Sequence, residues 1–295
     1  MIFTATLIAA DPLGAGDVSA AADRLRDAGC APADTAWVEP GVAADLAFGL
    51  APDAARAALE GAFARTDVVV QPLAGREKRV LVADMDSTMI TVECIDELAD
   101  YAGIKPEVAA VTERAMRGEL DFEAALDARV ALLAGLEEGV IERCLAERVA
   151  IMPGAKALVG TMRARGATCV LVSGGFTRFA EPVAAEIGFH RAVANVLEVE
   201  GGRLTGRVRR PIVGADAKER TLRATVAEAG VGLEDALAVG DGANDLPMIR
   251  AAGLGVAYRA KPIVAAAAAA RVEHGDLSTL LYAQGIPRRE WVTTD

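Results

Sequence analysis

The chain has 295 residues, of which 53% are hydrophobic and 25% are charged. This length and apolar fraction allow a sizeable core, arranged as two domains or as one large one. The formal net charge is -11 at pH 7. Such an acidic balance disfavours a nucleic-acid partner, which would require clustered basic residues, and a divalent cation suits it better.

The N-terminal residues and the cysteines both indicate a cytoplasmic location. Residues 1–17 contain no basic residue, so this segment is predicted to be a strand rather than a signal peptide. The apolar run at residues 263–270 is far shorter than a membrane span. The four cysteines are scattered without C-x-x-C spacing and there are only two histidines, which predicts reduced thiols and no zinc cluster. We therefore expect neither a membrane nor a nucleic-acid partner.

Residues 1–74 are predicted to form a separate N-terminal domain. Strands are expected at residues 2–10, on both sides of Pro40-Gly41 within residues 35–50, and at residues 66–73, with helices at residues 18–29 and 52–64. The order β-α-β-β-α-β is the split pattern of ferredoxin-like α+β domains. The polar residues 74–79 are predicted to be the linker into a second domain, residues 75–295.

The second domain is predicted to be α/β, with a doubly wound, Rossmann-like parallel sheet and an inserted helical cap. The unbroken apolar run at residues 80–83 is typical of a strand covered on both faces. Residues 91–150 carry four helical patterns and no strand, which indicates a small helical bundle. Strands and helices then alternate again. The expected elements are strands at residues 167–175, 235–241 and 251–258, a hairpin at 191–208, and helices from residue 177, at 218–230 and at 263–270.

Three apolar strands of this domain end in polar residues. The residues at these ends are Asp84, Asp86, Ser173, Gly174, Asp241, Asn244 and Asp245. Ligands of an open α/β sheet bind outside the carboxyl ends of its strands, so we expect these residues to converge at one edge.

The aspartates among them indicate a metal site. Asp84 and Asp86 are spaced as at the start of a calcium-binding loop, but the glycine and glutamate that complete such a loop are missing. Taken alone, Asp84 fits a solvated turn, with Asp86 or Ser87 capping a helix, equally well. Asp241 and Asp245 at a second strand end favour the metal, because clustered carboxylates repel one another and Mg²⁺ relieves the repulsion.

Carboxylates around Mg²⁺ suit phosphoryl transfer. One aspartate can attack phosphorus and form an aspartyl-phosphate, and a second can protonate the leaving oxygen and then activate water. Ser173 and Gly174 could bind phosphate through a hydroxyl and a backbone N–H, although a glycine-rich turn also explains them. Lys218, at the start of a predicted helix, could add a positive charge, but a lysine in that place is more often a solvated surface residue.

The ordered motifs resemble those of the haloacid dehalogenase-like superfamily. Residues 84–88, DMDST, fit its motif D-x-D-x-[TV]; residues 171–175, LVSGG, fit the second motif; residues 240–248, GDGANDLPM, fit the fourth. Lys218 lies where the lysine of the third motif is expected. Within the superfamily, residues 84–99 and 115–133 are similar to those of the phosphoserine phosphatase family. The resemblance covers about residues 80–285.

This resemblance implies an activity and a role for each matching residue. The activity is Mg²⁺-dependent hydrolysis of O-phospho-L-serine to L-serine and phosphate, the last step of serine biosynthesis, with Asp84 as nucleophile and Asp86 as general acid/base. Mg²⁺ would be held by the Asp84 carboxylate, the main-chain carbonyl of Asp86 and Asp241, supported by Asp245. The other implied residues are Ser173, Gly174, Lys218 and Asn244 at the phosphate, Glu93 at the ammonium, Arg129 at the carboxylate, and Met116 and Phe122 lining the pocket.

An amino-acid substrate needs one anion for its ammonium and, ideally, one arginine fork for its carboxylate. Without the resemblance, Glu93 and Arg129 would be assigned to the surface of helices. Because these two residues do not fix the side chain of the substrate, another phosphorylated amino acid or small metabolite stays open. A regulatory amino-acid-binding protein with an inactive phosphatase half is disfavoured, since all the catalytic motifs are present.

The order of elements in residues 1–74 is similar to that of ACT-type amino-acid-binding domains. The similarity lies in the pattern and in no motif. It implies serine as a candidate effector, and by analogy a homodimer formed through the N-terminal sheet.

Overall fold

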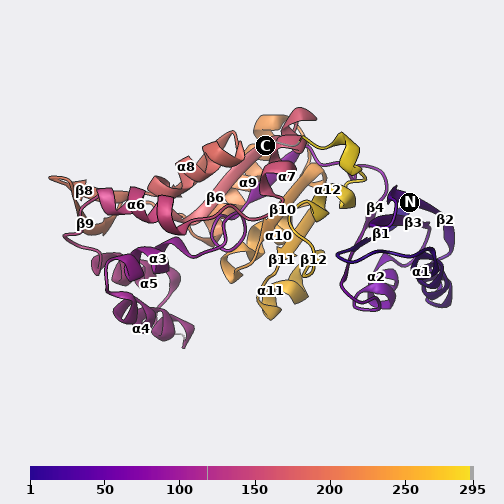
Figure 1. Ribbon diagram of the computed structural model, residues 1–295, viewed down its shortest axis with the longest axis horizontal. Coiled ribbons are helices and arrows are strands. Elements are labelled where there is room, and N and C mark those ends of the chain that lie inside the picture. The colour runs from indigo at the N-terminus through magenta and orange to yellow at the C-terminus, as the bar shows by residue number, and fades with distance from the viewer. Residues whose placement is uncertain (118, 293–295) are drawn as a thin grey trace.

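The structure, a computed structural model, describes residues 1–117 and 119–292, without the side chain of Met116. Figure 1 shows three parts along the long axis of the molecule. A four-stranded sheet with two helices lies at one end, a six-stranded sheet flanked by helices lies in the middle, and a group of helices with a β-hairpin lies at the other end. Within the described residues, no helix combines the length and apolar character needed to cross a membrane.

The N-terminal sheet has the predicted ferredoxin-like order of elements. These are β1 (Phe3–Ala9), α1 (Ala15–Asp27), β2 (Pro32–Glu39), β3 (Ala43–Phe48), α2 (Pro52–Leu59) and β4 (Thr66–Pro72). The strands are antiparallel in the order β2-β3-β1-β4. Helices α1 and α2 cover one face, where Leu7, Leu25 and Phe48 are buried. Gly29 follows α1 with a φ of 74°, a left-handed conformation that glycine adopts without strain, as predicted for the end of this helix.

The other face of this sheet packs against helix α12 (Thr279–Ala283), near the end of the chain. Ile8 and Val69 join the hydrophobic core that contains Leu280. At the edge of the sheet, the buried Asp67 accepts hydrogen bonds of 2.8–3.3 Å from the backbone N–H groups of residues 273–275. The two sheets are therefore joined by apolar packing and by one buried carboxylate.

The predicted linker, residues 74–79, is anchored rather than free. Nζ of the buried Lys78 donates to the carbonyl oxygens of Gly75 and Glu234 at 2.9 and 2.8 Å. The backbone N–H of Lys78 donates to Oε1 of Gln284 at 2.9 Å. The bonds to Glu234 and Gln284 hold this segment against the second sheet.

The second sheet is parallel and doubly wound, as predicted. Its strands are β5 (Val80–Ala83), β6 (Thr168–Phe176), β7 (Arg191–Asn195), β10 (Ala236–Gly240), β11 (Leu254–Tyr258) and β12 (Ala270–Val272), in the order β12-β11-β10-β5-β6-β7. Leu81 and Ala83 of β5 face α7 (Ala155–Ala164), α8 (Thr177–Ile187) and α12. Val80 and Val82 face α9 (Ala215–Ala229), α10 (Leu246–Ala251) and α11 (Pro262–Ala267). Every side chain of β5 is thus buried, which explains its unbroken apolar sequence.

Two local predictions were wrong at the edges of this sheet. Within residues 191–208 only β8 (Leu197–Glu200) and β9 (Arg203–Val208) form a hairpin, while β7 pairs with β6. The alanine run does not stay helical to residue 270, because α11 ends at Ala267 and β12 begins at Ala270. In both places pairing with a distant strand overrides the local pattern.

The predicted cap is a group of four helices inserted between β5 and α7. They are α3 (Cys94–Tyr101), α4 (Lys105–Met116), α5 (Phe122–Ala131) and α6 (Gly139–Arg148). The two segments that connect the cap to the sheet lie side by side. The N–H of Thr91 donates to the carbonyl of Ala150, and that of Met152 to the carbonyl of Met89, at 3.0 and 2.9 Å. This paired stem places the start of α3 directly beside the end of β5.

Candidate active site

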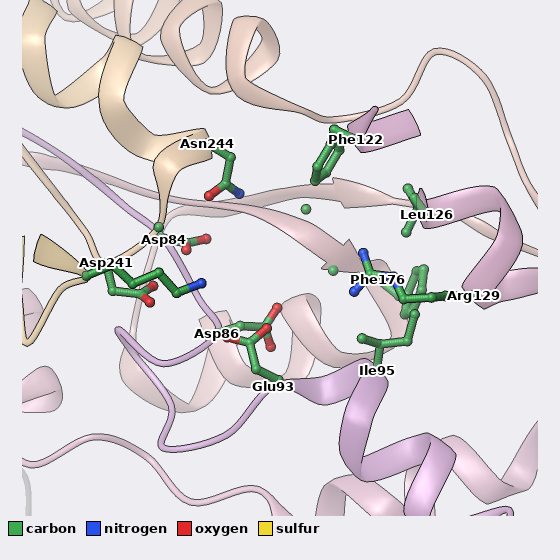
Figure 2. A pocket seen from close by; sticks show the side chains of 14 residues that line it. Asp84, Asp86, Glu93, Ile95, Phe122, Leu126, Arg129, Phe176, Asp241 and Asn244 are labelled. Atoms are coloured by element: carbon green, nitrogen blue, oxygen red, sulfur yellow. The ribbon is translucent and has the colours of Figure 1, made fainter. Parts of the chain in front are cut away.

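A small pocket lies where the carboxyl ends of β5, β6 and β10 meet the cap, and Figure 2 shows the side chains that line it. Its volume is about 140 Å³, well below the roughly 300–1,000 Å³ of pockets that hold drug-sized ligands, so it suits a small metabolite. The predicted residues that line it are Asp84, Asp86, Glu93, Phe122, Arg129, Gly174, Asp241 and Asn244. Ser173, Lys218 and Asp245 lie beneath its floor and contact these residues.

Lys218 links two aspartates in the floor. Its ammonium nitrogen Nζ donates to Oδ1 of Asp84 at 2.6 Å and to Oδ1 of Asp245 at 2.7 Å. The side chain of Lys218 has no exposed surface (0%). Burial alone would lower the pKa of Lys218, but the two carboxylates outweigh burial and raise it. Lys218 therefore stays charged, as a buried ammonium between two carboxylates.

Asp84 and Asp245 differ in how many of their carboxylate oxygens are already hydrogen-bonded within the protein. Asp245 uses both carboxylate oxygens inside the protein, because Oδ2 accepts a hydrogen bond from the N–H of Gly242 at 3.0 Å. Asp84 uses Oδ1 for Lys218, which leaves Oδ2 as the oxygen available to a ligand. Burial and then the charge of Asp245 raise the pKa of Asp84 well above its usual value, against the opposing effect of Lys218. A cationic ligand would relieve this crowding of negative charge.

Gly240, the last residue of β10, allows this packing. A Cβ atom at this position would lie 2.5 Å from Cγ of Asp245. The carboxylate thus lies directly against the backbone, which only glycine permits.

Asp86 lies on the side of the pocket nearest the cap. Its Oδ1 accepts a hydrogen bond from the N–H of Cys94, in the first turn of α3, at 3.0 Å, and its Oδ2 accepts one from the Ser173 hydroxyl at 3.3 Å. Burial, then the neighbouring charge of Glu93, raises the pKa of Asp86 to about 6. Among the aspartates of this edge, Asp86 is the one in contact with the cap.

Ser173 and Gly174 do not lie in a turn. Strand β6 continues through Phe176, so both residues are part of the sheet. The N–H of Gly175 donates to the Ser173 hydroxyl at 2.8 Å, and a Cβ at Gly175 would come within 2.8 Å of Oδ2 of Asp86. The glycines thus let Asp86 and a ligand approach the backbone of β6 closely.

Three aspartates form a candidate metal centre. Carboxylate oxygens of Asp84, Asp241 and Asp245 lie within 4.8 Å of one another, although both oxygens of Asp245 already accept hydrogen bonds. Burial, followed by the charges of Asp245 and Glu93, raises the pKa of Asp241 to about 6. The donors are all oxygen atoms, which Mg²⁺ prefers, and the raised pKa values of Asp84 and Asp241 indicate too little compensating positive charge around these two carboxylates. The site therefore fits a divalent cation.

The cap contributes two predicted residues of opposite charge. Arg129 of α5 and Glu93, which precedes α3, lie at the cap end of the pocket in Figure 2. Burial lowers the pKa of the Arg129 guanidinium. Oε1 of Glu93 accepts a hydrogen bond from the Ser87 hydroxyl at 2.8 Å. The carboxylate of Glu93 and the planar guanidinium of Arg129 thus face the pocket that contains the aspartates.

Phe122 closes the pocket on a third side. A Cβ at Gly174 or Gly214 would lie 3.2 Å from the Phe122 ring, so this aromatic residue of the cap lies close against two glycines of the sheet domain. The amide of Asn244 points into the pocket above Asp84 (Figure 2). Met116, predicted to line the pocket, has a side chain outside the described residues.

The sequence profile described as haloacid dehalogenase-like hydrolase matches residues 81–250, from β5 to the last turn of α10. These residues contain every aspartate of the pocket and the whole cap. The chain belongs to the haloacid dehalogenase-like hydrolases.

Within this family the chain is similar to phosphoserine phosphatases. It is 49% identical over 228 residues to that of Streptomyces coelicolor, covering 77% of this chain and 55% of the relative. It is 46% identical over 215 residues to that of Albidiferax ferrireducens, covering 71% of this chain and 91% of the relative. The solved structure of a probable phosphoserine phosphatase from Vibrio cholerae matches with a TM-score of 0.76 and 32% identity, covering 98% and 88% of the two chains. The chain spans little more than half the length of the Streptomyces relative.

The pocket of this haloacid dehalogenase-like hydrolase also contains residues that sequence analysis missed: Ile95, Leu126, Gly175, Phe176, Gly242 and Lys261. Lys261 lies three residues beyond β11, the neighbour of β10, and its backbone N–H donates to the Asp241 carbonyl at 3.3 Å. Its charge opposes the rise in the pKa of Asp241. The rule that ligands gather at strand ends, applied to β11 as well, could have found it.

Proposed function

We propose that the chain is a phosphoserine phosphatase, which hydrolyses O-phospho-L-serine to L-serine and phosphate with Mg²⁺ as cofactor. One observation carries the proposal: a single small pocket has a lysine-bound aspartate on its floor and an opposite-charge pair, Glu93 and Arg129, on its cap side. The floor suits phosphoryl chemistry, and the pair suits the two charged groups of an amino acid. Similarity to phosphoserine phosphatases supports the substrate.

The residues that would hold Mg²⁺ are the carboxylates of Asp84 and Asp241 and the main-chain carbonyl of Asp86. Asp245 supports them from behind, because Lys218 and Gly242 already occupy both its oxygens. When bound, Mg²⁺ neutralises phosphate charge and orients the phosphoryl group toward the nucleophile.

In the first step, Asp84 attacks phosphorus through the oxygen that Lys218 does not bind. A bond forms between this oxygen and phosphorus, and the bond from phosphorus to the serine oxygen breaks. Asp86 gives its proton to the leaving oxygen, so that serine departs as a neutral alcohol. Lys218, Asn244, Ser173 and the N–H of Gly174 hold the phosphoryl oxygens and stabilise their charge in the transition state.

In the second step, water attacks the phosphorus of the aspartyl-phosphate. Asp86, now ionised, takes a proton from this water, and the bond between phosphorus and the Asp84 oxygen breaks. Inorganic phosphate leaves, and both aspartates return to their starting states. The position of Asp86 between the floor and the cap, hydrogen-bonded to both Cys94 and Ser173, supports this double role.

The cap selects the substrate. Arg129 would bind the carboxylate of phosphoserine with its planar fork, and Glu93 would bind the ammonium. Phe122 excludes water from one side and limits the length of the ligand.

Residues 1–74 are proposed to be an ACT-like domain and residues 75–295 the phosphatase domain, with the cap at about 91–150. The separate apolar core between the N-terminal sheet and its two helices supports the first boundary. A cytoplasmic homodimer without membrane or nucleic-acid partners is the proposed state of the protein.

The proposal is tested by phosphate release from phosphoserine, phosphothreonine, homoserine phosphate and a sugar phosphate, with Mg²⁺ and with a chelator. We expect the highest kcat/KM with phosphoserine, loss of activity in chelator, and recovery with excess Mg²⁺. A preference for the sugar phosphate would overturn the substrate, and full activity in chelator would overturn the cofactor.

A further inference from the structure

Ser87, between Asp86 and Thr88, has a backbone conformation that serine rarely adopts. Its φ is 56°, in the left-handed region that favours glycine. The surrounding turn holds it there, because the N–H of Ser87 donates to the Val92 carbonyl at 3.2 Å and the N–H of Met89 donates to the Met85 carbonyl at 2.8 Å. A non-glycine residue held in this region beside a ligand pocket indicates a functional role for the residue.

The side chain of Ser87 holds the carboxylate of Glu93. The hydroxyl donates to Oε1 of Glu93 at 2.8 Å. Glu93 is the residue before α3, where a side chain ordinarily accepts a hydrogen bond from its own helix, but Glu93 makes no such bond. Its carboxylate is therefore directed toward Ser87 and the pocket instead of toward the helix.

We infer that Ser87 is a positioning residue that orients Glu93 to receive the ammonium group of the substrate. The inference rests on the proposed function, in which Glu93 binds that ammonium. Glu93 is exposed, and a free glutamate side chain would lose rotamer freedom each time substrate binds. A hydroxyl that fixes the carboxylate beforehand reduces this cost, and the left-handed turn aims the hydroxyl. Ser87 thus favours substrates that carry an ammonium group.

The alternative role for Ser87 is to shape the turn through its backbone alone. Two substitutions separate the roles. Ser87→Ala removes the hydroxyl and keeps the strained backbone, whereas Ser87→Gly removes the hydroxyl and relieves the strain. If only the backbone matters, Ser87→Gly behaves like the wild type. If the hydroxyl matters, the two variants share the same defect.

The experiment compares phosphoserine with 3-(phosphonooxy)propanoate, the same molecule with hydrogen in place of the ammonium group. The readout is the ratio of the two kcat/KM values, measured on the full chain. We expect both Ser87 variants to lower this ratio by roughly 5-fold, as for one lost hydrogen bond of typical net strength, through a higher KM for phosphoserine. Ser19→Ala, on the exposed face of α1, is the matched control and should keep the wild-type ratio.

A wild-type ratio in Ser87→Gly would overturn the inference, as would equal losses on both substrates. In a Glu93→Gln background, adding Ser87→Gly should have no further effect on the ratio, and an additive loss would also overturn it. Should Ser87→Ala fail to fold, Ser87→Gly still provides the test, because it relieves the strained turn. If the wild type itself shows no preference for phosphoserine over the analogue, the proposed function fails instead, which keeps the two failures distinct.

Discussion

The two sides of the pocket are built differently. On the floor, Asp84, Lys218 and Asp245 are buried, and each is held by others of the set at 2.6–2.7 Å. On the cap side, Glu93 is exposed and held by one hydroxyl, and Arg129 is half-buried. The groups that would react thus lie at the carboxyl end of a parallel sheet, whereas the groups that would recognise the substrate belong to an insertion. This arrangement separates chemistry from specificity.

Substitutions on the two sides of the pocket should therefore have different effects. Substitutions in the floor should reduce kcat or stability, because buried charges lose their partners there. Substitutions in the cap should raise KM, because their groups bind substrate and transition state alike.

The largest effect is expected for Asp84→Asn. An amide cannot act as the nucleophile, so kcat should fall by at least about 10⁴-fold, while the similar shape of asparagine preserves the fold. Phosphate release and a thermal unfolding curve measure the two quantities. Turnover near the wild-type rate would show that Asp84 is not the nucleophile, and would contradict the assignment of the chemistry to the pocket floor.

The second prediction concerns stability. Lys218→Met removes the ammonium and leaves the carboxylates of Asp84 and Asp245 facing each other in a buried place, so the free energy of unfolding should fall by about 3–5 kcal/mol. Urea denaturation measures the change. The matched control is Lys156→Met, because Lys156 is 40% exposed and pairs with Glu186 on the surface; its effect should stay within about 1 kcal/mol. Equal stability of the two variants would show that the floor is not held together by Lys218.

The third prediction tests the cap side. Arg129→Ala should raise the KM for phosphoserine by roughly 10- to 100-fold, since a charged hydrogen-bonding pair with the substrate carboxylate is lost. The change in kcat should be much smaller. Steady-state kinetics with phosphoserine gives both constants, and Arg129→Lys should restore only part of the affinity because lysine lacks the planar fork. An unchanged KM would withdraw Arg129 from substrate binding.

The smallest effect is expected where the cap meets the loop before α9. Arg210 forms ion pairs with Glu123 and Asp127 of α5 on the exposed surface. Arg210→Ala should lower stability by less than about 1 kcal/mol, and the difference should shrink further in high salt. Thermal unfolding at two salt concentrations checks this. A large loss of activity would mean that surface charges, rather than Phe122 and the paired stem, set the position of the cap.

The sequence predicted those site residues that directly follow an apolar strand. Asp84 and Asp86 follow one apolar strand, and Asp241 follows another. Because ligands bind outside the carboxyl ends of such strands, these residues were predicted to lie in one site. Lys218 was different, because its partners lie 134 and 27 residues away. Its position alone indicated a surface lysine, and only the family resemblance placed it in the site.

Other parts of the structure could not be predicted from local patterns. Strand β7 was predicted with the wrong partner, and β12 lies at the end of an alanine run predicted to be helical; each is an edge strand whose pairing depends on a neighbour distant in sequence, β6 or β11. Serine does not indicate a left-handed turn in a sequence, so the hydrogen bond from Ser87 to Glu93 was not predicted either. Lys261 was missed because the end of β11 was not considered, and Lys261 itself comes three positions after that end, behind Arg259 and Ala260.

The central claim is that Asp84 carries the phosphoryl group during turnover. The most direct test is to mix the enzyme with phosphoserine labelled with ³²P in the presence of Mg²⁺, quench with acid within one turnover, and identify the labelled peptide by mass spectrometry. We expect label on Asp84, in the peptide that contains residues 80–90. Label on another residue, or turnover with no labelled protein at any time, would contradict it.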